Sequence, residues 1–138
     1  MVKRMIIVLV ILCFYQTLNI ENCIASSRNL LASYYSVQSL KQEGTWKYSK
    51  GRCADGSLFK DSNFTAASRD FSLGSVLCIT NLQNGKQVTV RVTDRINKRF
   101  AKTRIDLSQR AFSELLSKGE SLDKGLIKVK VELLNNPR

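Results

Sequence analysis

Two segments of the chain alternate apolar and polar residues, which is the pattern of a β-strand that buries one face. Residues 87–94 (QVTVRVTD) place three valines on one side, and residues 126–134 (LIKVKVELL) place four apolar side chains opposite charged ones. Residues 29–36 (NLLASYYS) and 76–82 (VLCITNL) also predict strands, because they are short apolar runs between polar stretches. Asn84-Gly85 then predicts a hairpin between 76–82 and 87–94, closed by a type I′ turn.

The spacing of apolar residues changes between positions 104 and 119 (RIDLSQRAFSELLSKG), where it fits a helix. Ser108 can cap this helix, which is predicted to end near Ser117, before Gly119. Residues 37–50 are polar and irregular and predict a long loop, and Asp55-Gly56 predicts a turn. Several short strands, one short helix and a single proline predict a mainly β domain, either a small barrel or a sandwich.

Residues 1–25 have the organisation of a secretory signal peptide. A basic head is followed by eleven nearly unbroken apolar residues (MIIVLVILCFY), which is too short for the roughly 20 residues that span a bilayer. Small residues follow at Ala25 and Ser26. We therefore predict a signal peptide over 1–25 and a single domain over 26–138, with an uncleaved membrane anchor as the alternative.

The composition narrows the classes of function. The chain carries 22 Lys and Arg against 11 Asp and Glu, a net charge of +11 that is spread along the sequence. For an exported protein this charge favours anionic envelope polymers or membrane surfaces over nucleic acid, although it is also compatible with a merely well-solvated basic surface. The chain has no histidine, so catalytic triads and imidazole metal sites are excluded. Any chemistry must use carboxylates, hydroxyls, lysines or tyrosines.

The four cysteines differ in their context. Cys13 lies within the predicted signal, and Cys23 lies near its cleavage region, where a lipoprotein cysteine is an alternative. Cys53 and Cys78 lie in the domain, and in an exported protein they predict a disulfide, with two buried thiols as the alternative. No CxxC motif is present, so we predict no metal site.

Asp94 ends the apolar stripe of residues 87–94. Continued alternation would place its carboxylate on the valine face, where loss of hydration favours the protonated form and lets the group act as an acid. The alternative is that Asp94 only ends the strand by turn bonding or pairs with Arg95.

Five phrases that follow one another in the chain resemble one family. They are ASYYS (32–36), CADGSLF (53–59), FTAASRDFSLGS (64–75), VLCITNLQNGKQVTVRVTDR (76–95) and RIDLSQRAFSELL (104–116). Together they resemble the RlpA-like (rare lipoprotein A) family, whose members are double-psi β-barrels related to expansins and to some lytic transglycosylases. The match covers nearly all of residues 30–134. It implies a six-stranded double-psi β-barrel.

The resemblance also implies a function. Such a protein is exported to the periplasm or cell envelope, acts on peptidoglycan glycan strands in cell wall organisation, and uses no cofactor. Endolytic lytic transglycosylases leave 1,6-anhydro ends, a reaction that one carboxylic acid can carry without water or a second nucleophile. The alternative is an expansin-like module that binds glycan or an envelope partner without cutting it. A nucleic-acid partner would require that residues 1–25 are not a signal.

The resemblance assigns the site residues one by one. Asp94 matches the family's D-R aspartate, thought to be catalytic, and Asp106 matches the aspartate of the expansin phrase F-D-L-S, which either assists or only fixes the turn before the helix. Tyr34 and Tyr35 resemble paired aromatics near the groove, so that one is expected in the core and the other free to stack on a sugar. Arg95 is expected to contact substrate.

The chain departs from the family pattern at several positions. Ser57 and Ser68 stand where the family has a glutamate and a histidine, so they are expected to contact substrate but not to titrate near neutral pH. The family's D-R-G-P-F loop here reads DRINKRF (94–100), with neither Gly nor Pro and with one extra residue before IDLS. These departures favour the non-catalytic alternative, whereas Asp94 favours the enzyme.

We expect the mature protein to begin near Ser26, because the strand and turn signals all follow Asn29. Amino-terminal sequencing of the exported protein tests this expectation. A product that begins at Met1 would contradict it, and a lipid-modified product that begins at Cys23 would instead support the lipoprotein alternative.

Overall fold

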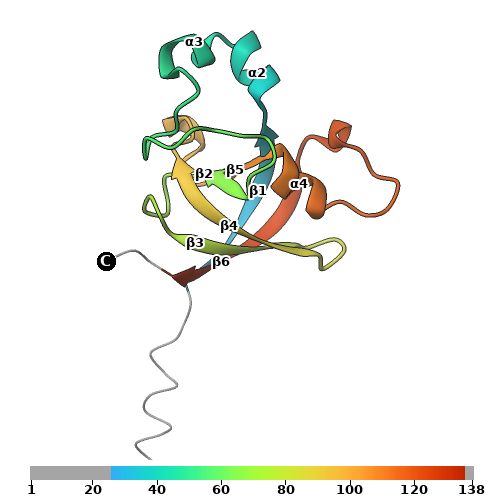
Figure 1. Ribbon diagram of the computed structural model, residues 1–138. Helices are drawn as coiled ribbons and strands as arrows, with labels where there is room; N and C mark the ends of the chain where they lie inside the picture. The colour runs from blue at the N-terminus through green and yellow to red at the C-terminus, as the bar shows by residue number, and fades with distance from the viewer. Residues whose placement is uncertain (1–25, 136–138) are drawn as a thin grey trace, which may run out of the picture.

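The computed structural model describes residues 26–135, which form one closed six-stranded barrel (Figure 1). The order of the strands around the barrel is β1-β5-β2-β4-β3-β6. The pairs β1/β5 and β2/β4 are parallel and the other four are antiparallel. The strands are β1 (Ser27–Tyr35), β2 (Thr65–Ala67), β3 (Val76–Asn81), β4 (Gln87–Asp94), β5 (Arg104–Ser108) and β6 (Ile127–Asn135). The six-stranded barrel is confirmed, and the sandwich is not formed. The predicted signal peptide and the lipidation of Cys23 lie outside the described residues.

The alternating segments place their apolar faces inside the barrel, as predicted. In β4 the three valines at 88, 90 and 92 are buried, and the residues between them at 89 and 91 are exposed. Phe112 from the helix α4 (Gln109–Glu114) is fully buried against this core. Burial of each such side chain contributes about 1.5–3 kcal/mol, so the interior of the barrel supplies most of the stability of the domain.

The hairpin β3–β4 is confirmed, but its turn is not of type I′. That turn needs positive φ at two adjacent residues, and here Gly85 has φ +76° while Asn84 does not share this conformation. The chain instead forms a longer loop, in which the Gly85 N–H donates to the Asn81 carbonyl at 2.8 Å. The side chains of Asn81 and Asn84 accept from the N–H groups of Gln83 and Lys86, both at 2.9 Å. These local side-chain bonds stabilise the longer loop.

The prediction of a long loop over 37–50 is wrong, because this segment forms the two short helices α2 (Val37–Gln42) and α3 (Thr45–Ser49). Ser36 and Ser39 cap the start of α2 reciprocally, and Gly44, with φ +77°, turns the chain into α3. The one-helix expectation is therefore wrong as well. Both helices stand over one end of the barrel (Figure 1). Among residues 26–135, no helix is long and apolar enough to cross a membrane.

The helix α4 begins where predicted, since the Ser108 hydroxyl accepts from the Ala111 N–H, but it ends at Glu114 rather than near Ser117. Two further 3₁₀ turns, η1 (Lys98–Phe100) and η2 (Leu122–Lys124), complete the described elements.

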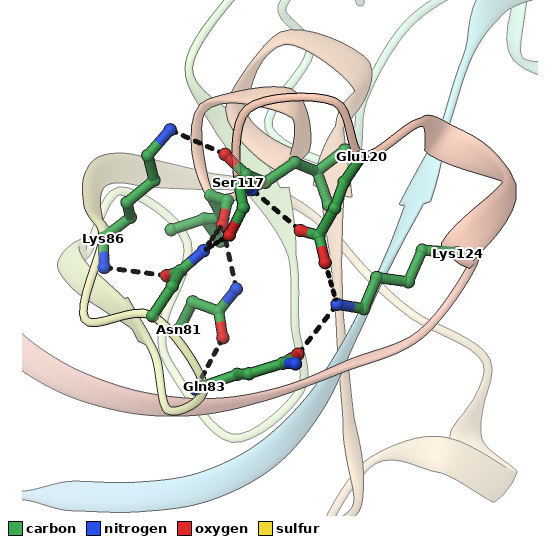
Figure 2. A network of polar contacts seen from close by, with 9 residues as sticks. Asn81, Gln83, Lys86, Ser117, Glu120 and Lys124 are labelled. Carbon is green, nitrogen blue, oxygen red and sulfur yellow. Dashed lines mark hydrogen bonds and ion pairs between the residues drawn. The ribbon is translucent and has the colours of Figure 1, made fainter.

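Side chains of the β3–β4 hairpin bind the carbonyls at the end of α4 (Figure 2). Asn81 and Asn84 both donate from Nδ2 to the Leu115 carbonyl at 2.9 Å, and Lys86 Nζ donates to the Leu116 carbonyl at 2.6 Å. A second set of contacts joins the segment after α4 to the hairpin, because Lys124 Nζ donates to Glu120 in that segment and to Gln83 in the hairpin. Helix ends leave carbonyls without partners inside the helix, so this network satisfies them.

The disulfide predicted between Cys53 and Cys78 is not formed, and both are free thiols. Cys78 is in β3 opposite Thr89, whereas Cys53 is in a loop whose next residue, Ala54, bonds to Asp94. Thr89 and Asp94 are five residues apart on β4, which corresponds to roughly 17 Å along a strand. A disulfide requires Cα atoms less than about 7 Å apart, so this arrangement excludes it.

We predict that Asn81→Ala lowers the free energy of unfolding by about 1–3 kcal/mol, because Asn81 is 1% exposed and its side chain bonds both the Leu115 carbonyl and the Gln83 N–H. Asn84→Ala is the matched control, since it removes a bond to the same carbonyl from an exposed side chain. Urea unfolding of the three proteins measures the difference. Equal losses for the two variants would contradict a special role for Asn81.

Candidate functional site

A groove of about 590 Å³ opens at the end of the barrel that carries α2 and α3. Its walls come from the last residues of β1, the loop that joins α2 to α3, the end of β4 with the residues that follow it, and β5. Asp94 and Asp106, the two carboxylates predicted as catalytic, both line this groove. The third carboxylate in its lining is Glu43.

The two aspartates lie on one line across the sheet. Asp106 is paired with Ser33 on one side and with Ala67 on the other, and Ala67 is paired in turn with Asp94. Neighbouring strands are about 4.8 Å apart, so the Cα atoms of Asp94 and Asp106 are separated by about 10 Å. Because Ala67 carries only a methyl group, the space between the two carboxylates stays open to a ligand.

Asp94 does not continue the valine face, contrary to the expectation from alternation. The register between β2 and β4 shifts at this point, since Ala66 pairs with Val92 but Ala67 pairs with Asp94. Such a bulge adds one residue to a strand and redirects its side chains. Thr93 is consequently buried, and Asp94 is half-buried at the edge of the groove.

Backbone donors hold the Asp94 carboxylate in place. Its Oδ1 accepts from the N–H of Ala54 at 3.1 Å and from the N–H of Arg95 at 2.8 Å, and within residues 26–135 its second oxygen accepts no hydrogen bond. The guanidinium of Arg95 forms no ion pair with Asp94. It donates instead to the carbonyls of Ser68 and Phe71, at 2.8 and 2.7 Å. Arg95 therefore fixes the 68–71 loop and is not free to bind substrate with that nitrogen.

Asp106 is also half-buried in the groove. Burial raises the pKa of its carboxyl, and the hydrogen bond from the Ser33 hydroxyl and the charge of Arg104 partly oppose this shift. Glu43 adds to the rise in pKa by like-charge repulsion. A carboxyl in this setting keeps its proton to a higher pH than an exposed one.

The two tyrosines occupy different surroundings. Both line the groove, and Tyr34, which is partly buried, packs against the core residue Phe112 at 5.3 Å between ring centroids. Tyr35 is stacked on Phe59 at 4.4 Å, so one face of its ring is already covered and unavailable to a sugar. Burial and the nearby Asp94 raise the pKa of the Tyr35 phenol, which keeps it protonated beside both aspartates.

Neither serine of the predicted substrate set lines the groove. Ser68 is 0% exposed, so it cannot touch a substrate in this conformation. Its backbone N–H donates to the Asp94 carbonyl at 3.0 Å, which makes it a support for the end of β4. Ser57 is exposed, and its hydroxyl donates to Asp55 at 2.6 Å within the predicted turn. The nearby thiol of Cys53 is buried, and this burial raises its pKa.

Several residues of the groove were not singled out from the sequence. Ser33 and Glu43 are brought to Asp106 only by strand pairing and by the α2–α3 segment, so no local pattern could have indicated them. Arg99 and Phe100 belong to the altered loop NKRF, whose concentration of positive charge was a usable signal. Within residues 26–135, no three metal-binding side chains gather into a metal site.

Comparison with known proteins agrees with the barrel and the groove. Residues 28–131 match the family model described as lytic transglycolase. The chain is 31% identical over 125 residues to the endolytic peptidoglycan transglycosylase RlpA of Pasteurella multocida, covering 90% of this chain and 37% of that protein. It is 32% identical over 108 residues to the RlpA of Haemophilus influenzae, covering 76% of this chain and 32% of that one. The chain thus spans about a third of the length of these relatives.

Solved structures show the same fold at lower identity. A Streptomyces papain inhibitor superposes with a TM-score of 0.60 at 21% identity, over 82% of this chain and 98% of that one. The expansin of Clavibacter michiganensis superposes with a TM-score of 0.54 at 19% identity, over 82% of this chain and 52% of that one. The match of residues 28–131 and the identity to the RlpA proteins show that this chain belongs to the lytic transglycolase family, as an RlpA-like double-psi β-barrel.

Proposed function

We propose that this protein is an exported endolytic lytic transglycosylase that cleaves peptidoglycan glycan strands and leaves 1,6-anhydro ends. The observation that carries the proposal is the placement of Asp94 and Asp106 on one line in one groove, separated by the small side chain of Ala67. The identity to proteins named as endolytic peptidoglycan transglycosylases supports the choice of substrate and reaction. The positive net charge suits an anionic envelope polymer.

In the proposed reaction Asp94 is both the acid and the base. Its carboxyl gives a proton to the glycosidic oxygen, the bond between that oxygen and C1 breaks, and an oxocarbenium-like centre forms at C1. The resulting carboxylate takes the proton of the sugar's own 6-hydroxyl, and O6 then bonds to C1. No water is consumed, and the proton returns to Asp94. The two backbone donors to Oδ1 leave the other oxygen of Asp94 free for both transfers.

The surroundings of Asp94 support this role. Tyr35 stays protonated beside both aspartates, because burial and the charge of Asp94 raise the pKa of its phenol. The Ser68 N–H donates to the Asp94 carbonyl at 3.0 Å, and the Arg95 guanidinium donates to the Ser68 carbonyl at 2.8 Å, so both bonds tie the end of β4 to Ser68. A fixed carboxylate of this kind is what proton transfer in a defined geometry needs.

Asp106 is the second candidate for the acid, because burial raises its pKa and it lines the same groove. The two assignments differ in which side of Ala67 the glycosidic oxygen occupies. If Asp106 is the acid, the Ser33 hydroxyl orients the reacting carboxyl, because it donates a hydrogen bond to Asp106.

A second function, binding of glycan without cleavage, is favoured by the two serines. A serine hydroxyl does not titrate near neutral pH, so neither residue supplies the titratable group expected at these positions from the family resemblance. Ser57 is also bonded to Asp55, and Ser68 is buried. In this case the groove would hold a strand in the manner of an expansin-like module, and the aspartates would only accept hydrogen bonds from sugar hydroxyls.

We predict that Asp94→Asn lowers the formation of anhydro ends by a factor of roughly 10²–10⁴, because asparagine keeps the shape and accepts the same backbone bonds but cannot transfer a proton. Purified glycan strands are digested, and their ends are analysed by mass spectrometry. Asp123→Asn is the matched control, since it removes an exposed carboxylate outside the groove. It should cut at the wild-type rate.

Asp106→Asn and Ser57→Glu complete this test. If Asp94→Asn retains activity and Asp106→Asn loses it, the acid is Asp106. If the wild-type protein binds strands but makes no anhydro ends, while Ser57→Glu makes them, the protein is a binding module that lacks the second acidic group expected from the family. Restoring the histidine at Ser68 is unsuitable, because a fully buried serine leaves no room for a larger ring.

A further inference from the structure

Two arginines stack on one aromatic ring at the rim of the groove. The guanidinium carbons of Arg99 and Arg104 lie over the ring of Phe100, 4.5 and 4.2 Å from its centroid. All three residues line the same groove as Asp94 and Asp106. We call Arg99, Phe100 and Arg104 the arginine stack. Stacking fixes the position of a guanidinium while it leaves the N–H groups at its edge available for hydrogen bonds.

The charges of the arginine stack are not used within the protein. Among residues 26–135, the guanidinium groups of Arg99 and Arg104 form no hydrogen bond or ion pair, whereas the guanidinium of Arg95 is occupied by two carbonyls. Arg104 acts on Asp106 only through space, where its charge lowers the pKa that burial raises. Two positioned cations without a partner are a feature that a bound anion would explain.

The surrounding loop adds to this positive field. Residues 95–105 contain five basic residues and no carboxylate. Lys98 and Lys102 are exposed and lie in the same loop, but they do not line the groove. The loop therefore contains arginines that line the groove and lysines that do not.

From these contacts we propose that the arginine stack binds a carboxylate carried by the glycan strand next to the sugar that is cleaved. The guanidinium edge presents paired N–H donors that match the two oxygens of a carboxylate. This inference rests on the proposed function, because the groove must hold a glycan. The carboxylate has two sources, the lactyl group of the sugar itself or a peptide attached to that group. Either would place a negative charge beside the strand and so set its position relative to Asp94 and Asp106.

The test measures binding instead of cleavage. An Asp94→Asn protein is titrated with fluorescently labelled peptidoglycan strands in three forms: strands freed of peptides, the same strands with carboxylates converted to methylamides, and strands that keep their peptides. We expect peptide-free strands to bind roughly tenfold more tightly than amidated strands, because one charge-assisted hydrogen bond changes the dissociation constant by about this factor. Peptide-bearing strands that bind like the peptide-free ones show that the site also accepts a peptide carboxylate, and those that bind like amidated ones assign it to the sugar alone.

Variants of the stack and its loop supply the controls. Arg99→Ala should lose roughly the same tenfold for carboxylate-bearing strands and should leave the binding of amidated strands unchanged. Phe100→Leu keeps the apolar volume but removes the π face, so it should weaken the same contact. Lys98→Ala and Lys102→Ala each remove one positive charge from the same loop, and they should change binding by less than about twofold.

Two outcomes would overturn the inference. One is equal binding of amidated and unmodified strands by the Asp94→Asn protein. The other is an equal loss for Lys98→Ala and Arg99→Ala, which would show a diffuse charge effect. Neither outcome concerns the formation of anhydro ends, and a protein that binds carboxylates but does not cut would leave the inference standing while the proposed enzyme activity fails.

Discussion

The short strand β2 joins the two halves of the site, and the remaining geometry depends on how it pairs. Its three residues run parallel to β4 and antiparallel to β5, so the end of one strand and the middle of the other meet at Ala67. Both alanines of β2 are buried, and larger side chains there would push the neighbouring strands apart or fill the groove. The register shift at the same point turns Asp94 out of the core. One small strand thus closes the barrel and spaces the two aspartates.

The groove combines groups of opposite charge that do not neutralise each other. The guanidinium of Arg95 is held by backbone carbonyls, and Asp94 is held by backbone N–H groups, so these neighbours in sequence form no ion pair. Asp106 is bonded to a neutral hydroxyl, and the nearest arginine is stacked on Phe100. Buried ion pairs gain little over their desolvation cost. Separate partners leave both the carboxylates and the arginines available to a ligand.

Local patterns in the sequence were sufficient for much of the barrel. Burial of alternate residues specifies the strands, and a serine followed by an apolar helical face specifies the start of α4, so both were predicted correctly. The segment 37–50 was not, because its helices bury no residue completely and depend on Ser36, Ser39 and Gly44 at their ends. The turn at Asn84-Gly85 was also mistaken, since the side chains of both asparagines of the hairpin bind α4 and its loop, which is distant in sequence.

The sequence by itself determined that this protein is a mainly β domain of the RlpA-like kind and that, without histidine, no imidazole takes part in its chemistry. Periodicity and motif order are properties of the linear chain, so they were readable without a structure. Only the tertiary structure decided which groups share the groove. Strand pairing brings Ser33 to Asp106 and places Ala67 between the two aspartates. A bulge turns the Asp94 side chain out of the core, and burial keeps Ser68 out of the groove. Each of these depends on register between strands distant in sequence, which no local pattern of residues encodes.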